Sequence, residues 1–308
     1  MYEKDDPRSA LATAPRPDSG AAIAAAQYLD LWETPVVRAQ NVILVHTDAR
    51  DGDDLDNGTL EGELAIIVTD ASPAFTVLSG DGTTKVDSPG LVVVPPGASR
   101  ISVHGDGPLV RLVEATEPAW RDRVANADAY AEDHPRVALL ERWPAPAEQR
   151  VRFYPLSEVP DDPKRFGRIF RTRSFMVNFL PPQNGPRDPR KLSPHHHDDF
   201  EQLSLAVQGE YVHHIRTPWL PDSTTWREDE HVRIGSPSVT IIPPPTVHTS
   251  AAIDPGVNQL IDIFSPPRVD FSEKPGWVLN ADDYPRPLSG GSGWRSPRPG
   301  AKPRMSQP

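Results

Sequence analysis

The sequence contains no cysteine among its 308 residues. Disulfide bonds and thiolate metal ligands are therefore excluded, and a metal site has to use histidine, aspartate or glutamate. No stretch reaches the roughly 18 consecutive apolar residues of a membrane-spanning helix. Residues 21–29 are apolar but short, and they lack the basic lead-in of a secretory signal. These absences predict a cytoplasmic protein with no membrane partner.

The chain is also poor in basic residues. Lysine and arginine together number 32, against 43 aspartates and glutamates, which gives a net charge of −11. Proteins that bind nucleic acids normally present a basic face to the phosphates. The charge balance therefore argues against nucleic acid as a partner.

Proline, in contrast, is abundant, with 37 residues. Because proline breaks helix interiors, this content argues against a helical bundle and favours short strands joined by turns. Short apolar runs bounded by turn residues recur in both halves of the chain, for example at 91–94, 238–242 and 257–264. Regularly spaced short strands predict an all-β sandwich or barrel.

The composition along the chain predicts five regions. Residues 21–32 are rich in alanine and predict a short helix, and residues 117–142 predict a helical connector with a break near His134. The regions are a disordered tail at 1–20, an N-terminal domain at 21–116, a connector at 117–165, a C-terminal domain at 166–284, and a disordered tail at 285–308.

Chemistry-bearing residues gather in the C-terminal half. His195 and His197 are two residues apart, so a strand presents both on one face. Glu201 follows, and His248 arrives after an apolar strand and a proline turn. Three nitrogens and one oxygen that converge in this way make a divalent metal site. In this reading Gln202 faces away from the site.

The two halves carry a related feature. In each, an apolar strand runs into a proline turn, and a polar residue follows five positions after the first proline. That residue is His248 in the second half and Arg100 in the first. The first half also has only His46 where a pair of histidines would be needed. We therefore expect the first half to share the architecture but to bind no metal.

These residues resemble the two sequence motifs of the cupin superfamily. The first motif has two histidines separated by one residue, then a glutamate and a glycine, and the second ends a proline turn with a histidine. The resemblance spans about residues 35–115 and 167–270, with Pro189 and Pro245 in place of two motif glycines. It implies an all-β fold of two antiparallel jelly-roll barrels in tandem with a short helical connector, and it allows a homodimer. The implied metal ligands are His195, His197, Glu201 and His248.

The segment after Glu201 predicts further pocket residues if it forms a hairpin that turns near Gly209. An even-length turn places His214 and Arg216 on the same face as Glu201, Leu203 and Leu205. An odd-length turn presents Tyr211 and His213 instead. Two-residue turns are the commonest, so we expect His214 as acid or base and Arg216 as the contact for a substrate carboxylate.

A three-histidine, one-glutamate site leaves coordination positions free for a substrate, and Mn, Fe, Zn, Ni and Co all accept these ligands. We therefore expect one divalent metal ion and a small oxygenated, carboxylate-bearing substrate. The first hypothesis is an isomerase or lyase that polarises a carbonyl and transfers a proton, since the layout is similar to that of bicupin sugar-acid isomerases. The alternatives are an iron-dependent dioxygenase that cleaves rings or carbon–carbon bonds, and a bicupin that binds small molecules without catalysis.

Overall fold

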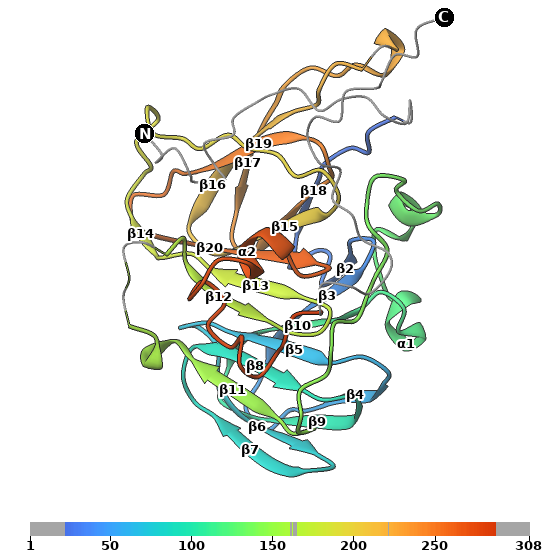
Figure 1. The fold of residues 1–308 in the computed structure, drawn as a ribbon. Coiled ribbons are helices and arrows are strands. Elements are labelled where there is room, and N and C mark those ends of the chain that lie inside the picture. Colours follow the sequence, from blue (N-terminus) through green and yellow to red (C-terminus); the bar gives the residue numbers. More distant parts are fainter. Residues whose placement is uncertain (1–21, 161, 163–164, 221, 288–308) are drawn as a thin grey trace, which may run out of the picture.

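The computed structural model describes residues 22–287, apart from 161, 163, 164 and 221. The predicted N-terminal tail and most of the predicted C-terminal tail lie outside the described residues. The described chain is mostly β-strand and forms two barrels, one above the other in Figure 1. None of its helices is both long enough and apolar enough to cross a membrane.

The C-terminal barrel consists of two sheets. Its inner sheet has the order β1 (Gln27–Asp30), β18 (Ser238–Ile242), β15 (Glu201–Gln208), β20 (Val257–Ser265), β13 (Met176–Phe179) and β12 (Arg168–Arg171), and β14 (Gln183–Asn184) also pairs with β20. Its outer sheet has the order β17 (Glu230–Gly235), β16 (Glu210–Arg216) and β19 (Val247–Ala252).

The N-terminal barrel repeats this plan. Its inner sheet has the order β11 (Arg152–Pro155), β8 (Gly90–Val94), β5 (Leu64–Val68), β10 (Gly107–Glu114), β3 (Val42–Ala49) and β2 (Val36–Arg38). Its outer sheet has the order β4 (Asp54–Leu60), β9 (Gly97–His104), β6 (Ala74–Ser79) and β7 (Gly82–Val86).

The helices are short, and the segment 117–142, predicted as a helical connector, contains only one helical turn and one 3₁₀ turn. The helices are α1 (Pro118–Arg121) and α2 (Val269–Ser272), with 3₁₀ turns at Ala127–Tyr130, Leu156–Glu158 and Ser223–Thr225. The helix predicted for residues 21–32 is wrong, because Gln27–Asp30 form strand β1. Tertiary pairing overrides helix propensity there, since β1 completes its backbone hydrogen bonds on the edge of β18.

The two barrels exchange their edge strands. Strand β1 precedes the N-terminal barrel in the sequence but pairs with β18 of the C-terminal barrel. Strand β11 follows the N-terminal barrel and leads towards the C-terminal one, yet it pairs back onto β8. The predicted domain boundaries do not reflect this exchange, since 21–116 includes β1 and the predicted connector includes β11.

The two inner sheets pack face to face through one apolar core. This core contains side chains from both halves of the chain. Strand β15 shows how the alternation of side chains serves it, because Leu203 and Leu205 point into the shared core while Gln202 and Ser204 point into the C-terminal barrel. Each inner sheet is therefore buried on both faces, and only the face towards the other barrel has to be apolar.

The interiors of the two barrels differ in polarity. The N-terminal barrel is filled by a second apolar core that includes Leu64, Ile66 and Val92. Equivalent positions follow from the ladders: Ile66 pairs with Val92 and Arg111, and Ser204 pairs with Thr240 and Asp262. The N-terminal barrel thus has Arg111 at the place of Asp262, and Leu64, two residues before Ile66, at the place of Gln202.

The residue of the N-terminal barrel that corresponds to His248 is also not Arg100, the residue that the sequence predicted. Ser99, the residue before Arg100, is 4% exposed, and its hydroxyl accepts a hydrogen bond from the buried amide of Asn57 at 3.2 Å, so Ser99 is the residue that points into the N-terminal barrel. Arg100 instead lies exposed on the outside, where its Nε donates to Asp54 at 3.0 Å. The turn between β8 and β9 has two residues and the turn between β18 and β19 has four, so an equal count from the first proline does not reach equivalent positions.

We predict that Leu205→Ala destabilises the protein by about 2–5 kcal/mol, because the substitution opens a cavity between the two inner sheets. Leu205 is fully buried in the shared core. Leu78→Ala is the matched control, since Leu78 is 41% exposed and its loss should change stability by about 0.5 kcal/mol or less. Chemical denaturation measures both, and equal effects of the two substitutions would contradict the shared core.

Candidate metal centre

The three predicted histidines come together at one end of the C-terminal barrel. His195 lies just before β15 and His248 on β19, and their backbones exchange two hydrogen bonds of 3.0 and 2.8 Å. His197 extends from the same loop as His195. Each of the three offers one ring nitrogen, and these nitrogens lie within 4.8 Å of one another. The bridge between the two backbones therefore brings together residues that are about fifty positions apart in the sequence.

Backbone carbonyls orient two of the imidazoles. Nδ1 of His195 lies 2.8 Å from the carbonyl oxygen of Ser193, and Nδ1 of His248 lies 2.9 Å from that of Thr246. Because a carbonyl only accepts, each Nδ1 carries the proton and donates it. The lone pair of each ring then sits on Nε2, which is the arrangement that metal-ligating histidines adopt.

Burial keeps His197 and His248 neutral. His197 is 8% exposed and His248 only 2%. Desolvation lowers the pKa of both side chains well below the ordinary value of 6.5, and the neighbouring cationic groups lower it further. A neutral imidazole is the form that binds a metal ion.

Glu201, the predicted fourth ligand, points away from the histidines. Its carboxylate accepts hydrogen bonds from the backbone N–H of Gln40 at 2.7 Å and from the hydroxyl of Tyr130 at 3.0 Å. Nδ1 of His134 lies 3.0 Å from the same carboxylate, and this contact raises the pKa of His134. Glu201 shares its strand face with Leu203 and Leu205, so the pleat directs it towards the N-terminal half.

Gln202 takes the place beside the histidines, although the sequence reading had it facing away. Its Oε1 lies 2.8 Å from Nε2 of His197 and 3.3 Å from Nε2 of His248. Two signals in the sequence pointed to it. The acidic residue of the cupin motif is spaced from the second histidine by either three or four residues, and the longer spacing reaches Gln202. The leucines at 203 and 205 also mark the face of Glu201 as a packing face.

The predicted pair His214 and Arg216 does not reach the site. Nδ1 of His214 lies 2.8 Å from Nδ1 of His231, and Nε of exposed Arg216 donates to Asp229 at 3.0 Å. The alternative pair is the buried one, since Tyr211 is 5% exposed and His213 fully buried.

The reason is that β15 and β16 form no hairpin. They belong to different sheets, and Gly209 turns the corner between them. Gly209 has a φ of +84°, and a Cβ there would lie 2.5 Å from Oδ1 of Asn258, so this corner requires glycine. The pairing rule for a hairpin therefore does not apply.

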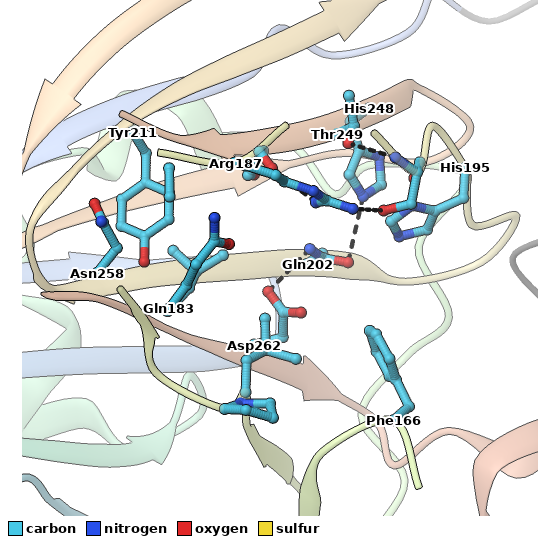
Figure 2. Close-up of a pocket in the computed structure, with 16 residues that line it drawn as sticks. Phe166, Gln183, Arg187, His195, Gln202, Tyr211, His248, Thr249, Asn258 and Asp262 are labelled. Atoms are coloured by element: carbon cyan, nitrogen blue, oxygen red, sulfur yellow. Dashed lines mark hydrogen bonds between the residues drawn. The ribbon is translucent and has the colours of Figure 1, made fainter. Parts of the chain in front are cut away.

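A pocket opens beside the histidines (Figure 2). Arg187 borders it, and its guanidinium donates to the carbonyl oxygen of Ser250 at 3.1 Å and to the hydroxyl of Ser193 at 3.0 Å. The hydrogen bonds of Arg187 within the described residues all go to neutral oxygens. Its charge is therefore available to an anion in the pocket. The polar residues around it include Gln183, Gln202, Tyr211, Asn258 and Asp262.

Two ionisable groups of this pocket have shifted pKa values. Burial raises the pKa of Asp262 to about 6, against the opposing effect of hydrogen bonds from Ser204 and Gln202. Burial and the nearby Asp262 carboxyl raise the pKa of Tyr211 far above neutrality. The Tyr211 phenol therefore keeps its proton and can donate it in a hydrogen bond.

The sequence as a whole matches no protein-family model and no curated protein. Solved structures match it by shape. A structure of oxalate decarboxylase, described by its substrate binding mode and reaction specificity switch, aligns over 87% of this chain and 86% of that chain, with a TM-score of 0.53 and 11% identity. An oxalate decarboxylase from Lactobacillus farciminis in complex with formate aligns over 80% and 83%, with a TM-score of 0.47 and 14% identity.

An IolB-like protein from Salmonella typhimurium LT2 aligns over 82% of this chain and 91% of that chain, with a TM-score of 0.49 and 12% identity. At such identities the likeness concerns the fold alone, and the first of the three structures carries it. The tandem barrels, their matching strand order and this likeness agree. The chain has the bicupin fold, and within the described residues its one histidine triad lies in the C-terminal barrel.

Proposed function

We propose that this protein is a metal-dependent bicupin enzyme that acts on a small, oxygenated, carboxylate-bearing substrate by carbonyl polarisation and proton transfer. The observation that carries the proposal is the convergence at the pocket of four uncharged atoms that can ligate a metal ion. They are the ring nitrogens of His195, His197 and His248 and Oε1 of Gln202.

The spacing of these donors suits a divalent ion. Nitrogen and oxygen ligands lie about 2.0–2.2 Å from such an ion, so two neighbouring ligand atoms are about 3 Å apart. Oε1 of Gln202 lies 2.8 and 3.3 Å from the ring nitrogens of His197 and His248, which fits this geometry. Mn, Fe, Zn, Ni and Co all accept such nitrogen and oxygen ligands.

The ligand set also bears on the substrate. All four donors are neutral, so they leave both positive charges of a divalent ion without compensation. Arg187 adds a further positive charge at the same pocket. A carboxylate-bearing substrate would neutralise part of this charge, and a guanidinium binds a carboxylate through two parallel hydrogen bonds. Arg187 thus takes the role that the sequence had suggested for Arg216.

The bound metal would act as a Lewis acid on a carbonyl or hydroxyl oxygen of the substrate. Arg187 would hold the carboxylate and fix the orientation of the molecule. The Tyr211 phenol, which stays protonated, would donate a hydrogen bond to the oxygen on which negative charge develops. These roles support an isomerase or lyase reaction.

We predict that the protein purified with its metal, or reconstituted with Mn²⁺, Fe²⁺, Co²⁺, Ni²⁺ or Zn²⁺, holds about one ion per chain. His248→Ala should weaken metal affinity by more than the 10- to 100-fold that loss of an outer-shell partner typically costs. Glu201→Gln is the matched control. It should keep its metal but lose about 1–3 kcal/mol of stability, because it disturbs the buried bonds to Tyr130 and His134.

Metal titration followed by elemental analysis measures these affinities. If Glu201→Gln loses its metal while His248→Ala keeps it, the assignment of the site is wrong.

We predict that Arg187→Gln weakens the binding of small carboxylates such as oxalate, malonate and pyruvate to the metal-loaded protein by about 10- to 100-fold, the value of a charged hydrogen-bonded contact. Arg216→Gln removes an equal charge on the same barrel, but Arg216 is exposed and paired with Asp229, and binding should stay at the wild-type level. Calorimetric titration compares the two variants. Equal binding by both would remove Arg187 from the substrate site.

We predict that the metal-loaded protein exchanges a substrate C–H proton with deuterium from D₂O when incubated with keto or hydroxy acids, and that it does so without oxygen uptake. NMR detects the exchange, and an oxygen electrode run in parallel detects oxygen consumption. Oxygen uptake that accompanies turnover of an enol or catechol substrate by the iron form would refute the isomerase or lyase reading in favour of a dioxygenase.

A further inference from the structure

The amide of Gln202 is held at both ends. Its Oε1 faces the imidazoles of the site, whereas its Nε2 donates to Oγ of Ser204 at 2.9 Å and to Oδ1 of Asp262 at 3.1 Å. Oγ of Ser204 in turn donates to the same carboxylate oxygen at 3.0 Å. Both protons of the amide nitrogen thus have acceptors, and neither is left over for the metal side. Figure 2 shows the hydrogen bond from Gln202 to Asp262.

The opposite orientation of this amide is unfavourable. A half-turn of the amide would turn its NH₂ group, which has no lone pair available for a metal ion, towards the ring nitrogens of the site. It would also place Oε1 at hydrogen-bonding distance from a carboxylate oxygen, with no proton between them. The carboxylate of Asp262 supplies the asymmetry, because a carboxylate only accepts, whereas the Ser204 hydroxyl can donate or accept.

The ladder fixes this carboxylate in place. Ser204 and Asp262 are register partners on β15 and β20, and they are 0% and 5% exposed. The strand pairing therefore places Asp262 beside Ser204 and next to the side chain of Gln202. The N-terminal barrel, which has no histidine triad among the described residues, has Arg111 at the place of Asp262 and Leu64 at that of Gln202.

We propose that Asp262 is the positioning residue of the metal centre, and that it holds the amide of Gln202 with Oε1 towards the ion. This inference rests on the metal site of the proposed function. It also explains why the ligand is glutamine in this chain. A glutamate at position 202 would place a second carboxylate oxygen about 3 Å from Asp262, where one oxygen would need a proton. Gln202 and Asp262 are therefore a matched pair, with the carboxylate outside the ligand shell.

The first test titrates Co²⁺ into the full-length protein and records its visible absorption spectrum. Asp262→Ala leaves the amide free to turn, so we expect Co²⁺ affinity to fall by about 10- to 100-fold and the spectrum to change as Oε1 leaves the ion. Asp262→Asn keeps an oxygen that can accept from Nε2, and we expect it to stay closer to the wild type. Thr240→Val is the matched control, because Thr240 is a buried barrel residue opposite Ser204 whose hydroxyl has no hydrogen-bond partner in the described structure.

The outcomes separate this inference from the proposed function. If the wild-type protein does not bind Co²⁺, the proposed function fails. If the wild type binds Co²⁺ and Asp262→Ala matches it in affinity and spectrum, only the role of Asp262 is overturned. A change in Thr240→Val as large as that in Asp262→Ala would overturn it too, since the effect would then belong to the barrel interior in general.

A second test needs no metal and covers the case in which Asp262→Ala does not fold. It measures thermal unfolding of the metal-free protein at pH 8 for Gln202→Glu, for Asp262→Asn and for the double variant. In the Gln202→Glu background, the carboxylates at positions 202 and 262 repel each other. Asp262→Asn removes this repulsion, because the amide that it introduces can donate a hydrogen bond to the carboxylate at position 202. We expect the melting temperature to rise by at least about 2 °C there and to fall or stay unchanged in the wild-type background. The same change in both backgrounds would show that the two side chains are independent, and would overturn the matched pair.

Discussion

The alternation of side chains along β15 is the constraint on which the site and the fold both depend. Neighbouring residues of a strand point to opposite faces, and this strand is buried on both. One face has to be apolar, because it packs against the other barrel through Leu203 and Leu205. The opposite face is enclosed by its own barrel, where Gln202 and Ser204 can keep hydrogen-bonded polar groups at little energetic cost. A shift by one residue would exchange the two faces and remove both the core and the site.

The same alternation allows the interiors of the two barrels to differ, because the face that meets the other barrel is apolar in both. In the N-terminal barrel the inward positions of the central strand are Leu64 and Ile66, and they belong to an apolar core. The buried guanidinium of Arg111 bonds to Asn57 and Thr47 inside that barrel. A fixed cation at this position opposes the binding of a metal ion. This barrel instead supplies an inner sheet against which the half with the histidine triad packs.

Much of this arrangement could be predicted from the sequence. The spacing of His195 and His197 and the proline turn before His248 identified the three histidines, because metal binding requires these residue types. The repeat of apolar strand and proline turn identified the tandem barrels. In contrast, the choice between Glu201 and Gln202 depended on which face of β15 meets the other half of the chain. That is a tertiary fact, although the leucines at 203 and 205 were a usable signal for it.

Other features were beyond local reasoning. The hairpin rule applied to Gly209 assumed that successive strands pair, whereas this chain crosses from one sheet to the other at that glycine. The choice of His214 over His213 followed from that assumption. Arg187 lies in a loop rich in proline and has no periodic signal, so only the folded chain shows that it borders the pocket. Asp262 likewise resembles any polar residue of a strand until its ladder partner is known.

The exchange of edge strands bears on how the chain can be divided. Strand β18 lies beside the strand that carries Gln202, and its outer edge is covered by β1, from the opposite end of the sequence. A fragment that began after the N-terminal barrel would leave the N–H and C=O groups of that edge without their partner, and such an edge is a template for association with other chains. Strand β8 would also lose its pairing with β11, unless the cut fell after residue 155. The two barrels are thus repeated in sequence but interlocked in space, and the chain has no cut site that yields two closed halves.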